Sequence, residues 1–207
     1  EIMVFARGLK ERFEARYPNI EVYLQGSVAL NMAFVEIPMK DLQTLFPLMF
    51  LFILVIIGIS TRTISGTFAT LVVILMSVFG ALGVFGWAKA VLAPSSEISP
   101  IIILTLSVAH SVHILASMRL SMQGGTEKND ALVEALRINI APVFITSITT
   151  AIGFLCMNFS DAPPFRLLGN IVATGVMAAF VLSVTLLPAL IAILPARVPE
   201  GSGIGSR

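Results

Sequence analysis

The sequence predicts an all-α polytopic membrane bundle with the tail of an extramembrane α+β domain at its N-terminus. Of its 207 residues, 57% are hydrophobic and 12% are charged, and a soluble domain carries roughly a quarter charged residues. Five uncharged stretches of 20, 26, 21, 23 and 30 residues follow one another along the chain. Each is long enough to cross a bilayer core as a helix. This pattern excludes an ordinary globular domain and a disordered chain, and the net charge of +1 indicates no nucleic-acid partner.

Residues 1–40 differ from the rest of the chain because they are rich in charge. Apolar residues recur near helical spacing at Ile2, Phe5, Leu9 and Phe13. Tyr17-Pro18-Asn19 should end that helix, and the alternation over residues 20–25 predicts a half-buried strand. A helix and one strand cannot bury a core alone. We therefore expect the end of a larger extramembrane α+β domain whose beginning is absent, and the alternative is a free amphipathic arm on the membrane.

The uncharged stretches predict five membrane spans. We place them at 42–61, 66–88, 98–118, 140–158 and 168–194. With the N-terminus outside, the inner side receives Arg62, Arg119, Lys128, Arg137 and Arg197. The outer loops then hold only Lys89 and Arg166, which agrees with the positive-inside rule. We expect residues 1–40 on the extracytoplasmic side of a bacterial inner (plasma) membrane and a flexible cytoplasmic tail at 197–207.

The predicted inner loop has an amphipathic pattern of its own. Gly124-Gly125 breaks the chain, and Leu132, Leu136 and Ile140 then form an apolar stripe at i, i+4 and i+8. This favours a helix over 126–138 that lies on the inner membrane interface and runs into the fourth span. Its role as a structural connector is the simplest interpretation.

Two ionisable side chains, His110 and His113, fall inside the third predicted span. Their i, i+3 spacing places both on one side of the helix, with Ser107 one turn before His110. Polar groups at this depth are costly and usually face a bundle interior or a water-filled path. Because the unperturbed imidazole pKa is ~6.5, these three residues are candidates for a proton relay. Two neutral histidines bonded to neighbouring hydroxyls are the structural alternative.

Other chemistries have weaker support in the sequence. A two-histidine metal site would need a carboxylate or further histidines nearby, and every carboxylate lies outside the predicted spans. A Ser–His dyad would need a nucleophile elbow and an oxyanion donor, and neither is evident. The single cysteine, Cys156, excludes an internal disulfide. We expect no enzymatic activity, no metal and no cofactor.

The fourth and fifth predicted spans carry small and hydroxyl residues suited to close packing near the relay. In the fourth span these are Thr146, Ser147, Thr149, Thr150 and Gly153. In the fifth, Gly169 and Gly175 each precede an alanine by four residues, a spacing that favours close helix contact. Both sets are more typical of packing than of chemistry.

Taken together, these residues resemble the resistance-nodulation-division (RND) superfamily, and within it the MMPL-like lipid exporters, which are related to sterol-sensing domains. The resemblance covers residues 20–195. Its specific parts are the run from Thr146 to Phe154, Gly169, Gly175, and the ending Ser183–Leu190.

The resemblance implies a half-transporter. Family members have twelve spans in two six-span repeats, each with a large extracytoplasmic loop after its first span. This chain would supply the end of a porter-like domain and spans two to six of one repeat. The implied partners are membrane lipids, a hydrophobic or lipid-like substrate and the second six-span repeat of the same protein; a homo-oligomer is left open.

The chain departs from the family where coupling would occur. Many relatives carry an Asp at the position of His110, and this chain reads Ala109-His110-Ser111-Val112-His113. Either His110 takes over the proton, the other repeat holds the Asp, or this copy is inactive. The leading hypothesis is a proton-driven exporter of hydrophobic or lipid-like molecules. The alternatives are a lipid- or sterol-sensing module that does not pump, and an accessory subunit of protein translocation.

Overall fold

The computed structural model describes residues 2–61, 63–90 and 94–194. The chain divides into two compact units with the boundary after Met49. The expected tail at 197–207 and the inner-side residues Arg62 and Arg197 lie outside the described residues, so those expectations stay predictions.

The first unit contains α1, Ile2–Arg16, and the beginning of α2, Ser27–Thr61. Helix α1 ends just before Tyr17-Pro18, as expected, and the amide of Tyr17 donates to the carbonyl of Phe13 at 2.9 Å. Across this unit the guanidinium of Arg7 forms a two-point ion pair with the carboxylate of Glu36, at 2.9 and 2.5 Å. Helices α1 and α2 are therefore joined through charged side chains.

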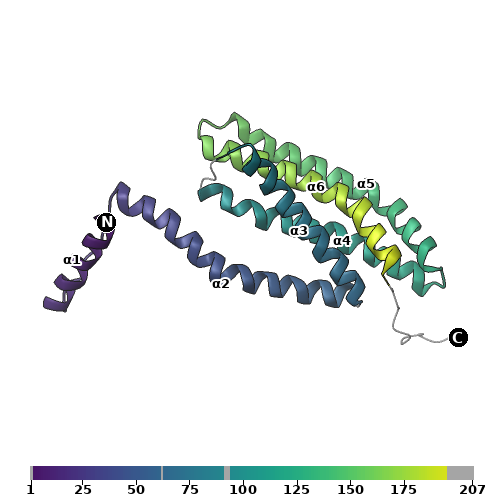
Figure 1. The fold of residues 1–207 in the computed structure, drawn as a ribbon, viewed down its shortest axis with the longest axis horizontal. Coiled ribbons are helices and arrows are strands. Elements are labelled where there is room, and N and C mark those ends of the chain that lie inside the picture. The colour runs from purple at the N-terminus through teal and green to yellow at the C-terminus, as the bar shows by residue number, and fades with distance from the viewer. Residues whose placement is uncertain (1, 62, 91–93, 195–207) are drawn as a thin grey trace. The chain divides into compact units, whose positions relative to one another are not determined.

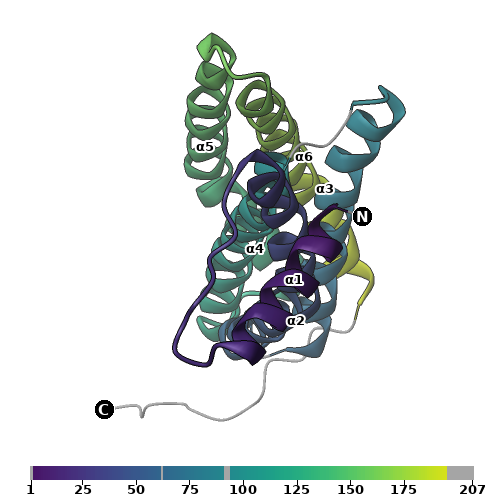
Figure 2. The ribbon, with the colours of Figure 1, turned by 90° about the vertical axis from the view of Figure 1, so that its left-hand side faces the viewer.

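The strand expected at residues 20–25 is absent from the described structure. These residues form a loop between α1 and α2 (Figure 2), and the amide of Val22 donates to the carboxylate of Glu14 at 3.0 Å. A strand needs the backbone of a neighbouring strand to pair with, and the described chain contains no other strand. The described residues are thus helical without the β part of an α+β domain.

The second unit contains four long apolar helices. They are α3 Ile64–Trp87, α4 Ser99–Gln123, α5 Lys128–Leu155 and α6 Pro163–Ile193, with short 3₁₀ turns η1 Pro94–Ile98 and η2 Cys156–Phe159. All four are long and apolar enough to cross a membrane. The first expected span, 42–61, falls in α2, whose apolar stretch Pro47–Ile59 is shorter. That span stays a prediction.

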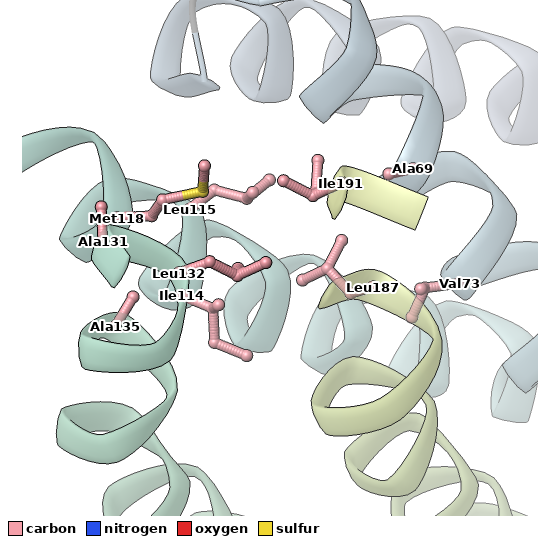
Figure 3. Close-up of a cluster of buried hydrophobic side chains, with 10 residues drawn as sticks. All are labelled: Ala69, Val73, Ile114, Leu115, Met118, Ala131, Leu132, Ala135, Leu187 and Ile191. Atoms are coloured by element: carbon pink, nitrogen blue, oxygen red, sulfur yellow. The ribbon is translucent and has the colours of Figure 1, made fainter. Parts of the chain in front are cut away.

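Helices α4 and α6 form the inner pair of this bundle. Each contacts α3, α5 and the other, whereas α3 and α5 make no comparable contact among the described residues (Figure 1). At one end, a single apolar cluster draws side chains from all four helices (Figure 3): Ala69, Val73, Ile114, Leu115, Met118, Ala131, Leu132, Ala135, Leu187 and Ile191. This packing makes both α4 and α6 central.

The helix expected at 126–138 falls at the beginning of α5, which continues into the following span. On this segment Ala131, Leu132 and Ala135 are buried in the bundle core, where the sequence indicated a surface facing the membrane interface. Leu136 packs against this core, while Ile140 is exposed. The apolar side chains at the beginning of α5 thus face the other helices of the bundle, and the first turns of α5 pack against protein.

Candidate functional site

His110 lies in the middle of α4 and is buried, with 2% of its surface exposed. Its ring nitrogen Nε2 lies 3.3 Å from the hydroxyl of Ser147 on α5. Both residues come from the faces along which α4 and α5 contact each other. Among the described residues, His110 is the one titratable side chain that is buried.

The hydrogen bonds around Ser147 assign the proton on the imidazole. The hydroxyl of Ser147 donates to the carbonyl of Val143 at 2.7 Å. A hydroxyl has a single hydrogen to donate, so in its contact with His110 the oxygen accepts and Nε2 donates. The neutral ring then carries its hydrogen on Nε2, and Nδ1 is an acceptor. Nδ1 is buried and has no hydrogen-bond partner within the described chain.

The structure separates the two histidines of the expected relay. Ser107 is fully buried beside His110 on α4 and donates to the carbonyl of Ile103 at 2.8 Å. His113, by contrast, is exposed. Three residues advance about 300° around a helix, so His113 lies about 60° from His110, at the edge of the buried face. The three residues do not form one buried chain in this structure.

The threonines expected to pack near the relay lie mostly on the outer face of α5. Thr146 and Thr149 are exposed and donate to carbonyls of their own helix at 2.9 and 2.8 Å. Thr150 is half-buried, and Gly153 is exposed, with open space where a Cβ would stand. None of the four has a side-chain contact with His110 among those observed.

Ser147 is the residue of α5 that meets the histidine, and the sequence grouped it with the threonines without distinguishing it from them. Its position could have been found from helical phase. The buried residues of α5 recur at three- and four-residue intervals: Ala131, Leu132, Ala135, Asn139, Val143, Ser147 and Ala151. Thr146 and Thr149 fall outside that series, because each position turns the side chain by about 100°.

The two glycines of α6 do pack closely. A Cβ on Gly175 would meet the side chain of Ile103 on α4 and, at 3.1 Å, that of Ala81 on α3. A Cβ on Gly169 would meet the backbone carbonyl oxygen of Phe154 at the end of α5. Glycine at these positions allows α6 to approach three neighbouring helices, as transmembrane contacts often require.

Polar contacts join the helices at both ends of the bundle. At one end the amides of Asn158 and Asn170 exchange two hydrogen bonds, at 2.9 and 3.0 Å. At the other, the ammonium of Lys128 donates to the carbonyls of Ala192 and Leu194 at 2.9 and 2.7 Å. Hydrogen bonds therefore join α5, together with the η2 turn that follows it, to α6 near both ends of α5.

Comparison with known proteins then identifies the family of this chain. The model of the MMPL family matches residues 10–202. The chain belongs to the MMPL family. This match confirms the resemblance to the RND superfamily drawn from the motif residues.

A curated relative of this MMPL chain is MJ1562 of Methanocaldococcus jannaschii, which is named as a membrane protein. The two are 27% identical over 177 residues, which is 85% of this chain and 45% of MJ1562. The chain thus spans about half the length of that relative.

The polar centre of this MMPL chain contains no carboxylate among the described residues. Its buried polar side chains are hydroxyls, the amide of Asn139 and the imidazole of His110. Nor do the described residues bring together three or more His, Cys, Asp or Glu side chains that could hold a metal ion. Within this part of the chain, His110 is the group that can take up and release a proton at the bundle centre.

Proposed function

We propose that this chain is part of a secondary transporter that exports hydrophobic or lipid-like molecules and is driven by protons. Membership of the MMPL family and four membrane-spanning helices support a transport role. In this proposal the second repeat, the membrane lipids and the substrate are the partners.

The proposal rests on the burial and the hydrogen bonding of His110. Its Nε2 donates to Ser147, and its buried Nδ1 retains a free lone pair. A proton taken up at Nδ1 converts a neutral buried ring into a cation, which changes the preferred packing around α4. Imidazole is the side chain that titrates closest to neutral pH, and a buried ring becomes charged only where water or a neighbouring group stabilises the cation. Alternate protonation at the bundle centre is a means to couple proton flow to helix movement.

We further propose that residues 1–40 lie on the extracytoplasmic side of the plasma membrane and belong to an α+β domain completed by other parts of the full protein. The apolar side chains Ile2, Phe5 and Leu9 of α1 are at least half exposed, which suits a helix that packs against further chain. Lys128 contacts the end of α6, so the beginning of α5 and that end lie together. This arrangement suits a positive inner side.

The test uses the full-length transporter in liposomes that contain a pH-sensitive dye and a fluorescent phospholipid analogue. An imposed pH gradient should drive movement of the analogue together with proton flux, and His110→Gln should abolish both. Gln keeps hydrogen-bonding groups but does not titrate in this range. His113→Gln is the matched control, since His113 is exposed.

Two results would overturn the proposal. If His110→Gln transports at the wild-type rate with the same pH profile, His110 is a packed polar residue and coupling lies elsewhere. If the wild-type protein binds the lipid analogue but shows no gradient-driven movement, the lipid-sensing alternative replaces the transporter.

A further inference from the structure

Three buried hydroxyl groups in the bundle have no hydrogen-bond partner within the described chain. They belong to Thr70 on α3, Ser111 on α4 and Ser183 on α6, and all three residues are fully buried. Other buried hydroxyls on the same helices behave differently. Ser77 and Ser107 each donate to the carbonyl four residues earlier, at 2.7 and 2.8 Å, which is the usual way a helix satisfies such a group.

Ser111 and Ser183 lie at the same level of the bundle. The close approach of Gly175 to Ile103 fixes the relative heights of α6 and α4. These two helices are separated by one antiparallel helix, so they run in the same direction. Ser183 and Ser111 each follow that contact by eight residues, which places both about 12 Å beyond it at 1.5 Å per residue. His110 precedes Ser111 directly.

Thr70 lies about one turn further along. Helix α3 runs in the opposite direction and meets the same contact through Ala81. Thr70 precedes Ala81 by eleven residues, so it lies about 16 Å from the contact. The three hydroxyls and His110 therefore occupy neighbouring levels on three mutually contacting helices.

The adjoining apolar cluster supports this convergence. Thr70 is one turn before Val73, Ser111 is one turn before Leu115, and Ser183 is one turn before Leu187. Val73, Leu115 and Leu187 all belong to the cluster in Figure 3. Residues one turn apart share a helix face, so the three hydroxyls lie on the faces that enclose this cluster.

We propose that Thr70, Ser111, Ser183 and Nδ1 of His110 bind internal water between α3, α4 and α6. A buried polar group without a partner is unfavourable, and a water molecule can donate two hydrogen bonds and accept two. Water can donate to the lone pair of Nδ1 and bond to hydroxyls that donate or accept. A cation suits the site less well, because the described buried residues include no carboxylate to balance its charge.

The functional role of this water rests on the proposed proton coupling through His110. A proton passes from a hydronium oxygen to Nδ1, so that one O–H bond breaks, one N–H bond forms and neutral water remains. On release the same bonds change in reverse. The water thus gives His110 access to protons from the α3–α4–α6 side of the bundle, opposite to its bond with Ser147.

The first test is radiolytic hydroxyl labelling of the full-length protein, which modifies buried side chains next to bound water. Leu115 and Leu187 should be labelled. Leu168 is the matched control, since it is as buried as Leu115 but belongs to a different apolar cluster. The triple variant Thr70→Val, Ser111→Ala, Ser183→Ala should lose the labelling at Leu115 and Leu187. Equal labelling of all three leucines, or none at Leu115 and Leu187, would overturn the proposal.

The second test uses single variants in case the triple variant does not fold. If water bridges the hydroxyls, Thr70→Val should lower the melting temperature, and its effect should be non-additive with that of Ser183→Ala. Without water, Thr70→Val removes an unpaired hydroxyl at constant shape and should leave the melting temperature equal or higher. Ser77→Ala, whose hydroxyl bonds to its own helix, should be additive with Ser183→Ala.

The two proposals fail separately. Labelled leucines together with a fully active His110→Gln variant would keep the water site and remove the proton role of His110. Unlabelled leucines together with an inactive His110→Gln variant would keep His110 and remove the water site.

Discussion

Gly169 of α6 lies against the backbone carbonyl oxygen of Phe154 at the end of α5, with no room for a Cβ between them. The obstacle is main chain, which cannot rotate out of the way as a side-chain terminus can. A second atom, the Cβ of Met157 in η2, lies 3.1 Å from the same position. The α5–α6 connection therefore depends on glycine at this point.

We predict that Gly169→Ala destabilises the protein, by about 1–3 kcal/mol or more, because overpacking forces the backbone apart. Gly153→Ala is the matched control, since nothing lies within 4 Å of a Cβ at Gly153. Thermal unfolding of the two variants in detergent gives the comparison. Equal melting temperatures would contradict the close contact at Gly169.

Gly175→Leu should damage folding far more than Leu182→Ala. A Cβ at Gly175 meets the Cγ1 of Ile103 at 2.5 Å, and Ile103 is itself fully buried. Leu182 is only partly buried beside the core, so its truncation leaves a smaller defect. Yield of folded protein and melting temperature measure the difference. Similar values for both variants would indicate that α6 can move away from α3 and α4 at low cost.

We predict that neutral His110 carries its hydrogen on Nε2. Nitrogen-15 NMR of ring-labelled histidine distinguishes a protonated from an unprotonated ring nitrogen. Ser147→Ala removes the acceptor at 3.3 Å and should shift the Nε2 signal of His110 while leaving His113 unchanged. A hydrogen found on Nδ1 would refute the assignment and remove the acceptor on which the internal water depends.

Lys128→Gln should loosen the end of α6. The ammonium of Lys128 satisfies two carbonyls there and complements the negative end of the helix dipole, worth about 0.3–1 kcal/mol. Hydrogen exchange should accelerate in the last turn of α6 and stay unchanged around Val176, which is deeply buried. Lys89→Gln is the control, and the same acceleration in that variant would count against a specific contact.

The Arg7–Glu36 ion pair should make the attachment of α1 depend on pH. The hydrogen bond from Arg7 holds the pKa of the Glu36 carboxyl below its usual value. The stability that the ion pair contributes is therefore present above the pKa that Glu36 has in the unfolded chain. It is lost as the pH falls through the lower pKa that Glu36 has in the folded chain. Both side chains are largely exposed, so the effect should be modest.

Hydrogen exchange in α1 of the full-length protein measures this effect. The protection of α1 amides, relative to their intrinsic exchange rate at each pH, should fall on acidification. Glu36→Gln should lower this protection already at neutral pH. Glu11→Gln is the control. If acidification loosens α1 equally in wild-type protein and in Glu36→Gln, another group is responsible.

Long uncharged stretches were sufficient to predict the four long helices, because hydrocarbon forces the backbone to bond within the segment. The side of the helix on which each residue lies was harder to predict from the sequence. Every residue around Thr146 and Ser147 is small or apolar, so polarity alone could not show that Ser147 faces His110 while Thr146 faces outward. The same holds for His113, which lies a sixth of a turn from His110, at the edge of the buried face.

The strand expected at residues 20–25 failed for a different reason. Alternation records which side chains suit a half-buried surface, but a strand exists only where a second backbone pairs with it. The described chain contains no such partner, and Val22 bonds to Glu14 instead. Local pattern was therefore informative for helices, which satisfy their own backbone, and insufficient for a strand.

The fastening of α5 to α6 at both ends restricts how this bundle can change shape. Close contact at Gly169 and the Asn158–Asn170 amide pair prevent the two helices from sliding at one end, and Lys128 prevents it at the other. The α5–α6 hairpin must therefore move as one rigid body. Helices α3 and α5 lie on opposite sides of the α4–α6 pair, so any hinge has to form where α3 and α4 contact this hairpin.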